Sequence, residues 1–122
     1  MRILVVEDEP LIRLGLASAI EDAGYEVSEA ANAGEAIRRL EAEPDILLIL
    51  TDVDMPGGMD GIALAHYVRD RWPPVHLIVI SGKVGVKPGT LPAGARFVSK
   101  PYQEPALLSM VETMITAGGN AI

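Results

Sequence analysis

Apolar residues along this chain form two alternating kinds of segment. Continuous runs rich in branched aliphatic side chains occur at 3–6, 46–50 and 77–80. Such runs are typical of strands buried on both faces of a parallel sheet. Residues 25–30 alternate more regularly between polar and apolar, as a strand near an edge does, and 96–98 is a short fifth run. The pattern therefore predicts five strands.

Between these runs, apolar residues recur at spacings of three and four, the period of an amphipathic helix. The first helical stretch covers 10–23, with Pro10 in a helix-opening position and Gly24 as the stop. Three more are centred on 33–40, with Asn32 as a candidate N-cap, on 64–72, before Pro73 and Pro74, and on 107–115, closed by Gly118 and Gly119. Alternating strands and helices predict a right-handed parallel α/β sheet covered on both faces.

Residues 81–94 break the alternation. The stretch contains four glycines and two prolines at a place where another helix is expected. We predict a loop there, with at most one helical turn. No repeat or linker interrupts the remaining sequence, so 1–122 is expected to be one domain.

Composition narrows the class of protein. A length of 122 residues fits a single domain, and the absence of cysteine excludes disulfides, thiolate metal sites and a cysteine nucleophile. The 17 acidic and 10 basic side chains give a net charge of −7, which argues against a nucleic-acid partner. The longest apolar run, 46–50, is far shorter than the ~20 residues of a membrane span, and acids follow the first strand too soon for a signal peptide. We expect a cytoplasmic domain with no membrane insertion.

Polar side chains follow four of the five predicted strands. In an open parallel sheet the carboxyl ends of the strands form the edge where ligands bind. The residues at that edge are Glu7-Asp8 after the first strand, Thr51-Asp52 after the third, Ser81-Gly82 after the fourth and Ser99-Lys100 after the fifth. Carboxylates, a hydroxyl and an ammonium group are therefore expected to converge.

Carboxylates that converge in this way repel one another unless a cation lies among them. Oxygen ligands without imidazole or thiolate favour Mg²⁺, which usually takes one or two carboxylates together with water and phosphate. A lysine and a hydroxyl opposite the metal would contact the oxygens of a transferred phosphoryl group. The remaining carboxylate is then the natural nucleophile, forming an acyl phosphate.

Four motifs in this order resemble the receiver domain of two-component response regulators, over essentially the whole chain. They are an acidic pair after the first strand, Asp-x-x-Met-Pro after the third at 52–56, Ser-Gly after the fourth at 81–82 and Lys-Pro after the fifth at 100–101. The resemblance implies a flavodoxin-like, doubly wound, five-stranded parallel sheet of order 2-1-3-4-5, here with the fourth helix short or missing. It also implies a phosphorelay protein that signals by changing its surface, not an enzyme, although it assists its own phosphorylation and dephosphorylation.

The resemblance assigns the acceptor and metal roles residue by residue. Asp52 would accept a phosphoryl group from a histidine kinase or histidine phosphotransfer protein. Asp8 and Asp52 would bind Mg²⁺, with Glu7 acting mainly through a bound water. The backbone carbonyl of Asp54 would add a metal ligand, and its carboxylate, like Lys83, would tune how quickly water removes the phosphate.

The switch residues are implied in the same way. Ser81 would move to hydrogen-bond the phosphate, Lys100 would pair with it, and Gly82 would leave room for it to enter. A cis bond between Lys100 and Pro101 would point the ammonium inward. Phe97 lies where the family keeps an aromatic whose rotamer follows the hydroxyl, although simple packing explains it equally well. The downstream target is a protein that the sequence does not identify.

Three features of the sequence depart from the family pattern. The loop at 55–61 has one residue more than usual, and the interval from Ser81 to Phe97 is a few residues short. The short interval removes the helix by which most receivers dimerise or engage an output domain. Nothing follows the last helix, so either a freestanding receiver or a receiver cut from a larger protein fits, and the Pro/Gly-rich segment favours the freestanding form.

Other functions remain open at this point. The DVD sequence at 52–54 also resembles the nucleophile and acid of haloacid-dehalogenase-like phosphatases, but those enzymes place it on the first strand of a much longer chain. A flavin-binding module would need a phosphate loop where the acids at 7–9 repel phosphate. A degenerate receiver kept as an interaction scaffold is the most serious alternative, and the complete set of acceptor residues argues against it.

Overall fold

Five parallel strands form a single sheet in the computed structural model, which describes residues 1–55, 57–82 and 88–119. The strand order is β2-β1-β3-β4-β5, the flavodoxin-like order that the resemblance implies. The strands are β1 (Arg2–Val6), β2 (Glu26–Ala30), β3 (Ile46–Asp52), β4 (His76–Ser81) and β5 (Arg96–Ser99). All neighbours pair in parallel, so every strand points its carboxyl end to the same edge.

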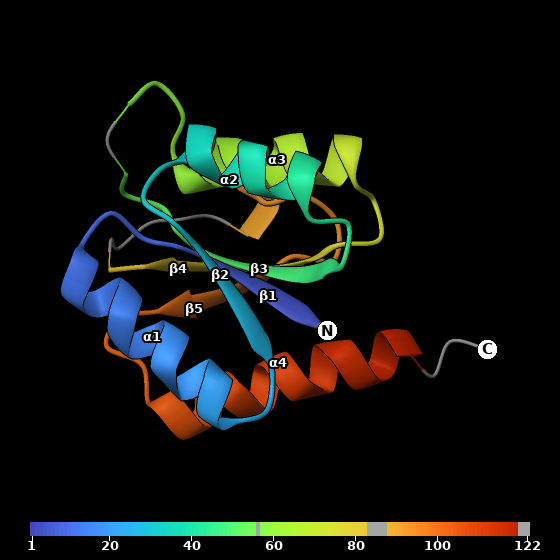
Figure 1. The fold of residues 1–122 in the computed structure, drawn as a ribbon. Helices are drawn as coiled ribbons and strands as arrows, with labels where there is room; N and C mark the ends of the chain where they lie inside the picture. Colours follow the sequence, from blue (N-terminus) through green and yellow to red (C-terminus); the bar gives the residue numbers. More distant parts are fainter. Residues whose placement is uncertain (56, 83–87, 120–122) are drawn as a thin grey trace.

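Helices cover both faces of this sheet (Figure 1). The helices α2 (Ala33–Ala42) and α3 (Gly61–Arg71) lie on one face, and α1 (Pro10–Asp22) and α4 (Glu104–Gly119) lie on the other. Each face has its own core of buried aliphatic side chains, because alternate residues of a strand point to opposite sides. The central strands β1, β3 and β4 contribute to both cores, which explains their continuous apolar runs. Among the described residues, no helix combines the length and apolar character needed to cross a bilayer.

The predicted elements are confirmed, with shifted bounds. The second strand begins at Glu26, because the backbone N–H of Tyr25 still bonds to the Ile20 carbonyl at the end of α1. Two strands run further than their apolar runs, so that Asp52 is the last residue of β3 and Ser81 the last of β4. The polar site residues therefore take part in the sheet, which fixes their backbones more firmly than a loop would.

The helix ends follow local rules in most cases. Pro10 is in the first turn of α1, and Gly24 adopts a φ of 102°, which a residue with a side chain rarely takes. The Asn32 side chain caps α2 by accepting from the Glu35 backbone N–H at 2.9 Å. The last helix, α4, ends at Gly119, within the glycine pair predicted to close it.

The prediction for 81–94 is confirmed where the structure describes it. Between β4 and β5 the described residues contain one element, the short 3₁₀ helix η1 (Pro88–Thr90). The Leu91 side chain packs into the core on the α3 side, where a fourth helix would otherwise lie.

Gly61 sets how closely α3 approaches the sheet edge. A Cβ atom on this residue would lie 2.0 Å from the backbone carbonyl oxygen of Asp52 and 2.8 Å from the Val53 Cα. Its own N–H donates to the Val53 carbonyl at 2.9 Å, and the Asp60 side chain caps the helix by accepting from the Ala63 N–H at 2.8 Å. The first turn of α3 thus rests directly on the backbone that carries Asp52.

We predict that Gly61→Ala destabilises the fold by about 2 kcal/mol or more, because the new methyl group collides with backbone that cannot rotate away. Gly15→Ala is the matched control, since Gly15 lies in α1 with no atom within 4 Å of an added Cβ. That change should stabilise by up to about 1 kcal/mol, the helix preference of alanine over glycine. Urea unfolding of both variants is the measurement. Equal stability of Gly61→Ala and wild type would contradict the close approach.

Candidate functional site

The predicted site residues meet at the carboxyl edge of the sheet. Glu7 and Asp8 follow β1, Asp52 ends β3, Ser81 ends β4 and Lys100 follows β5. The parallel register places these strand ends at the same level. Five residues separated by up to 93 positions in the sequence are therefore brought together by sheet topology alone.

Three carboxylates form the centre of this group. Glu7, Asp8 and Asp52 each offer an oxygen, and these oxygens all lie within 4.8 Å of one another. Glu7 and Asp52 are buried, whereas Asp8 is exposed. Carboxylate oxygens at this separation suit a hard divalent cation, and the exposed side of the group leaves coordination positions for water and phosphate, as Mg²⁺ prefers. The side chains present therefore fit a magnesium site.

Lys100 is the cation that faces these acids. Its Nζ lies 3.0 Å from Asp52 Oδ2 and 4.0 Å from Glu7 Oε1. Burial favours the neutral amine, but the hydrogen bond to Asp52 and the charges of Asp52 and Glu7 outweigh it, so the pKa of Lys100 is raised. Lys100 therefore stays charged, and its ammonium donates a hydrogen bond directly to the Asp52 carboxylate.

The surroundings of Glu7 raise the pKa of its carboxyl group well above the ordinary value. Burial raises its pKa to about 7, the Asp8 and Asp52 carboxylates act in the same direction, and a hydrogen bond from the Glu9 backbone N–H opposes them. That N–H donates to Glu7 Oε2 at 2.9 Å. A carboxyl group that ionises near neutral pH without a metal is one that a divalent cation would convert to its charged form.

The residues expected to act as a switch lie on or directly after β4 and β5. Ser81 is fully buried, and its carbonyl accepts from the Lys100 backbone N–H at 2.9 Å. The Lys100–Pro101 bond is cis, as predicted. Phe97 is partly buried on the α2 and α3 side of the sheet. An added Cβ on Gly82 would make ordinary contacts with the Lys100 side chain at 3.6 Å, so folding alone does not require glycine there.

Of the two residues expected to tune dephosphorylation, Asp54 bonds through its backbone N–H to Asp52 Oδ1 at 3.3 Å. Lys83 lies outside the described residues.

Sequence reasoning missed Arg13, and it placed Thr51 at this edge without identifying what its hydroxyl contacts. The Arg13 guanidinium on α1 donates to the Glu7 backbone carbonyl at 2.8 Å and pairs with Glu29 at 3.3 Å, which fixes the turn that carries the acidic pair. The Thr51 hydroxyl donates to the Asp52 carbonyl at 3.0 Å. Both residues act on backbone atoms, and no motif in the sequence signals such contacts.

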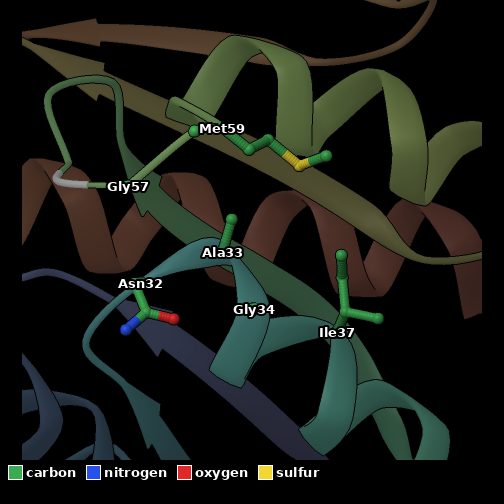
Figure 2. Close-up of a pocket in the computed structure, with 7 residues that line it drawn as sticks. Asn32, Ala33, Gly34, Ile37, Gly57 and Met59 are labelled. Carbon is green, nitrogen blue, oxygen red and sulfur yellow. The ribbon is translucent and has the colours of Figure 1, made fainter.

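A groove on the described surface lies apart from the acids. A groove of about 520 Å³ runs between the start of α2 and the 55–61 loop, lined by Asn32, Ala33, Gly34, Ile37, Gly57, Gly58 and Met59 (Figure 2). Its lining contains no carboxylate and no cation. A cavity of only about 10 Å³ lies beneath the site, next to Glu7, Asp52 and Lys100. The space beside the acid group is therefore small, and it suits an ion better than an organic ligand.

Sequence comparison connects the chain with signalling proteins. The response regulator receiver domain family matches residues 3–112. The response regulator receiver protein CpdR of Brucella abortus (strain 2308) is 38% identical over 119 residues, which cover 95% of this chain and 98% of CpdR. The sensor kinase CckA of the same organism is 36% identical over 119 residues, which cover 93% of this chain and 12% of the kinase. The chain is thus similar to a whole receiver protein and to a small part of a kinase.

Solved structures agree with this similarity. The CheY-like receiver domain protein from Methanospirillum hungatei JF-1 has a TM-score of 0.88 and 30% identity, over 97% of this chain and 95% of that one. The response regulator TrrA from Thermotoga maritima, solved in complex with Mg²⁺-BeF, has a TM-score of 0.79 and 27% identity, over 92% and 96% of the two chains. A similar structure thus holds magnesium together with a fluoride of beryllium.

We predict that the ionisation of Glu7 destabilises the metal-free domain as the pH rises from about 5 to about 8, while His76, whose pKa is lowered by burial, acts in the opposite direction in both wild type and the variant below. The pKa of Glu7 is 4.5 when unperturbed and about 7 in the fold, so within this interval the folded state binds the proton more tightly than the unfolded state does. Ionising Glu7 on the way to pH 8 therefore opposes folding. Thermal unfolding in EDTA across this pH series is the measurement.

Glu7→Gln should flatten that part of the pH dependence, and Mg²⁺ should restore stability at about pH 8 in the wild type. Other carboxyl groups titrate in both proteins, so the difference between the two curves isolates Glu7. Parallel curves for wild type and Glu7→Gln would show that Glu7 ionises normally.

Proposed function

The chain belongs to the response regulator receiver domain family, and on that premise we propose that residues 1–122 act as one phosphoacceptor switch with Asp52 as the acceptor. The family is a signalling domain that accepts phosphate and is not a conventional enzyme. The observation that supports the assignment best is the position of Asp52, buried at the end of β3, 3.0 Å from Lys100 Nζ and within the three-carboxylate group.

Transfer starts from a phosphohistidine on a cytoplasmic histidine kinase or phosphotransfer protein. A carboxylate oxygen of Asp52 attacks the phosphorus, the phosphorus–nitrogen bond breaks, and its electron pair returns to the imidazole. Asp8, Asp52 and the Asp54 backbone carbonyl would hold Mg²⁺, with Glu7 acting mainly through a bound water. The bound ion would supply positive charge that offsets the repulsion between these acids and the phosphoryl group. Since the protein provides the nucleophile and its alignment, it assists its own phosphorylation.

Lys100 and Ser81 act after transfer. In this structure the Lys100 ammonium is bonded to the Asp52 carboxylate. Once Asp52 carries a phosphoryl group, the ammonium bonds to the phosphoryl oxygens in place of the carboxylate. The Ser81 hydroxyl approaches the same group through the space beside Gly82, and Phe97 follows on the paired strand β5. Water later attacks the phosphorus of the acyl phosphate, and the Asp54 carboxylate, like Lys83, would tune how quickly this happens and so how long the signal lasts. Output is a shift between two conformers.

The kinase needs a docking surface next to Asp52, and α1 provides one. Leu11 and Leu14 on this helix are 78% and 59% exposed, which is unusual in a chain whose other described large aliphatic side chains are mostly buried. Ile12 on the same helix lines the small cavity beside Asp52 and Lys100, so the exposed apolar face borders the site. We infer that a partner helix packs here while its histidine reaches Asp52.

Asp52→Asn should abolish phosphorylation. In the presence of Mg²⁺ and acetyl phosphate, wild type should gain the mass of one phosphoryl group and the variant none, because an amide cannot form the acyl phosphate. Asp54→Asn is the matched control, since its side chain is not the proposed acceptor. Intact-mass spectrometry makes the measurement. Labelling of Asp52→Asn, or binding of neither Mg²⁺ nor phosphate by wild type, would instead indicate a different acceptor or a scaffold.

Lys100→Ala should still accept some phosphate but lose the conformational response, because the cation that follows the phosphoryl group is gone. Amide hydrogen exchange with and without acetyl phosphate should change at the ends of β4 and β5 in wild type and stay constant in the variant. Arg96→Ala is a control that removes a charge from the opposite end of β5. An unchanged response in Lys100→Ala would remove Lys100 from the switch.

Leu14→Glu should slow phosphotransfer from a kinase and leave labelling by acetyl phosphate unchanged, since the small donor needs no docking surface. The kinase is found by testing autophosphorylated kinases against wild type. Removing an interface anchor typically costs more than 1 kcal/mol of binding, or about tenfold in affinity. Equal transfer rates at limiting protein concentration would place the docking surface elsewhere.

A further inference from the structure

The connection from β4 to β5 is fastened to α3 by two side chains. His66 Nε2 lies 2.6 Å from the Thr90 carbonyl oxygen, and Arg69 Nε donates to the Ala93 carbonyl at 3.0 Å. Since a carbonyl only accepts, His66 Nε2 is the nitrogen that carries the proton. The spacing is three residues on both segments, so α3 and residues 88–95 run side by side with matched bonds. We name residues 88–95 the strap.

Arg69 also joins the strap to the beginning of β4. Its Nη1 donates to the Pro73 carbonyl at 2.6 Å and to the Val75 carbonyl at 2.9 Å, directly before the strand. The guanidinium of Arg69, on α3, thus connects this helix to the residues directly before β4 and to the strap that leads into β5. Gly94, next to Ala93, takes a φ of +80°, and an added Cβ there would lie 3.7 Å from Arg69 Nη2.

The strap packs against the same core as the predicted switch aromatic, Phe97. Leu91, Ala95 and Phe97 all pack against the core on the α2 and α3 face. Ile62 of α3 and Met59, just before that helix, pack against the same core. Polar bonds on the outside and apolar contacts on the inside thus connect the strap to α3.

The strap is also joined to the acceptor site through the sheet. Ser81 pairs with Ser99 across β4 and β5, and the Lys100 backbone N–H donates to the Ser81 carbonyl. When Ser81 and Lys100 close on a phosphoryl group, β5 moves with them. Ala95 directly precedes β5, so a shift of this strand strains the strap and its bonds to α3.

We propose that His66 and Arg69 are positioning residues that couple the ends of β4 and β5 to α3 through the strap, so that phosphorylation changes the α3 surface. The coupling rests on the proposed function, because it needs a phosphoryl group on Asp52. It gives α3 the output role in a chain whose connection from β4 to β5, as far as the structure describes it, has only the short helix η1.

The test is amide hydrogen exchange of the whole chain, with Mg²⁺ alone and with Mg²⁺ and beryllofluoride, a phosphoryl mimic. In wild type, beryllofluoride should change exchange in β4, β5, the strap and α3. In His66→Ala and Arg69→Ala the free strap should exchange about 2- to 10-fold faster, the effect of losing a hydrogen bond, and the response in α3 should be lost. Intact-mass labelling by acetyl phosphate should persist in both variants, because Asp52 is untouched.

His66→Gln and Arg71→Ala complete the design. The glutamine amide can donate to the Thr90 carbonyl and should restore coupling. Arg71→Ala removes the same charge from the same helix as Arg69→Ala. The Arg71 guanidinium lies over Tyr67 and Trp72 and not on the strap, so this variant should respond like wild type. If Arg69→Ala fails to fold, the His66 pair still decides the question.

Two results would overturn the coupling. If beryllofluoride changes β4 and β5 in wild type but leaves α3 unchanged, or if His66→Ala keeps a full α3 response, the inference is wrong and the acceptor role of Asp52 stands. If wild type neither gains phosphate nor responds anywhere to beryllofluoride, the proposed function and the coupling fall together.

Discussion

Mutual repulsion among the carboxylates of Glu7, Asp8 and Asp52 is the constraint on which the rest of this site depends. Two of the three are buried, and the pKa of Glu7 rises to about 7 because burial and its neighbours both disfavour its charge. The fold tolerates this group because Lys100 lies 3.0 Å from Asp52 and because buried strands hold the backbone on every side. A site arranged in this way favours a divalent cation and a phosphoryl group, both of which bring charges and ligands that the protein alone lacks.

Much of the fold could be predicted from the sequence, because branched apolar runs and helical spacing are local signals that the parallel topology combines in only a few ways. That the candidate site residues converge could be predicted for the same reason: each ends or follows a strand, and parallel strands end at one edge. The predicted strand ends were less accurate where polar residues continue a strand, as Asp52 and Ser81 do. The hydrophobic pattern marks only the apolar part of such a strand.

Contacts made by or with the backbone could not be predicted. Arg13 bonds the Glu7 carbonyl, and Gly61 leaves only enough room for the Asp52 carbonyl. Both depend on how two elements pack, and their side chains carry no motif of their own. They nevertheless determine where the acidic turn and the acceptor carboxylate lie, so the chemistry that the motifs reveal is positioned by residues that the motifs omit.

The same reasoning applies to signal output. The backbone N–H and C=O groups of a helix after β4 would hydrogen-bond to one another within the helix. An irregular strap must find hydrogen-bond donors for its carbonyls elsewhere. His66 and Arg69 donate to two of those carbonyls, so replacing a helix by a strap makes the connection depend on α3. Here the two hydrogen bonds join the strap to α3. Under the proposed coupling, a displacement at the carboxyl edge of the sheet would therefore reach α3, and the output surface would lie on this helix, which precedes β4 in the chain.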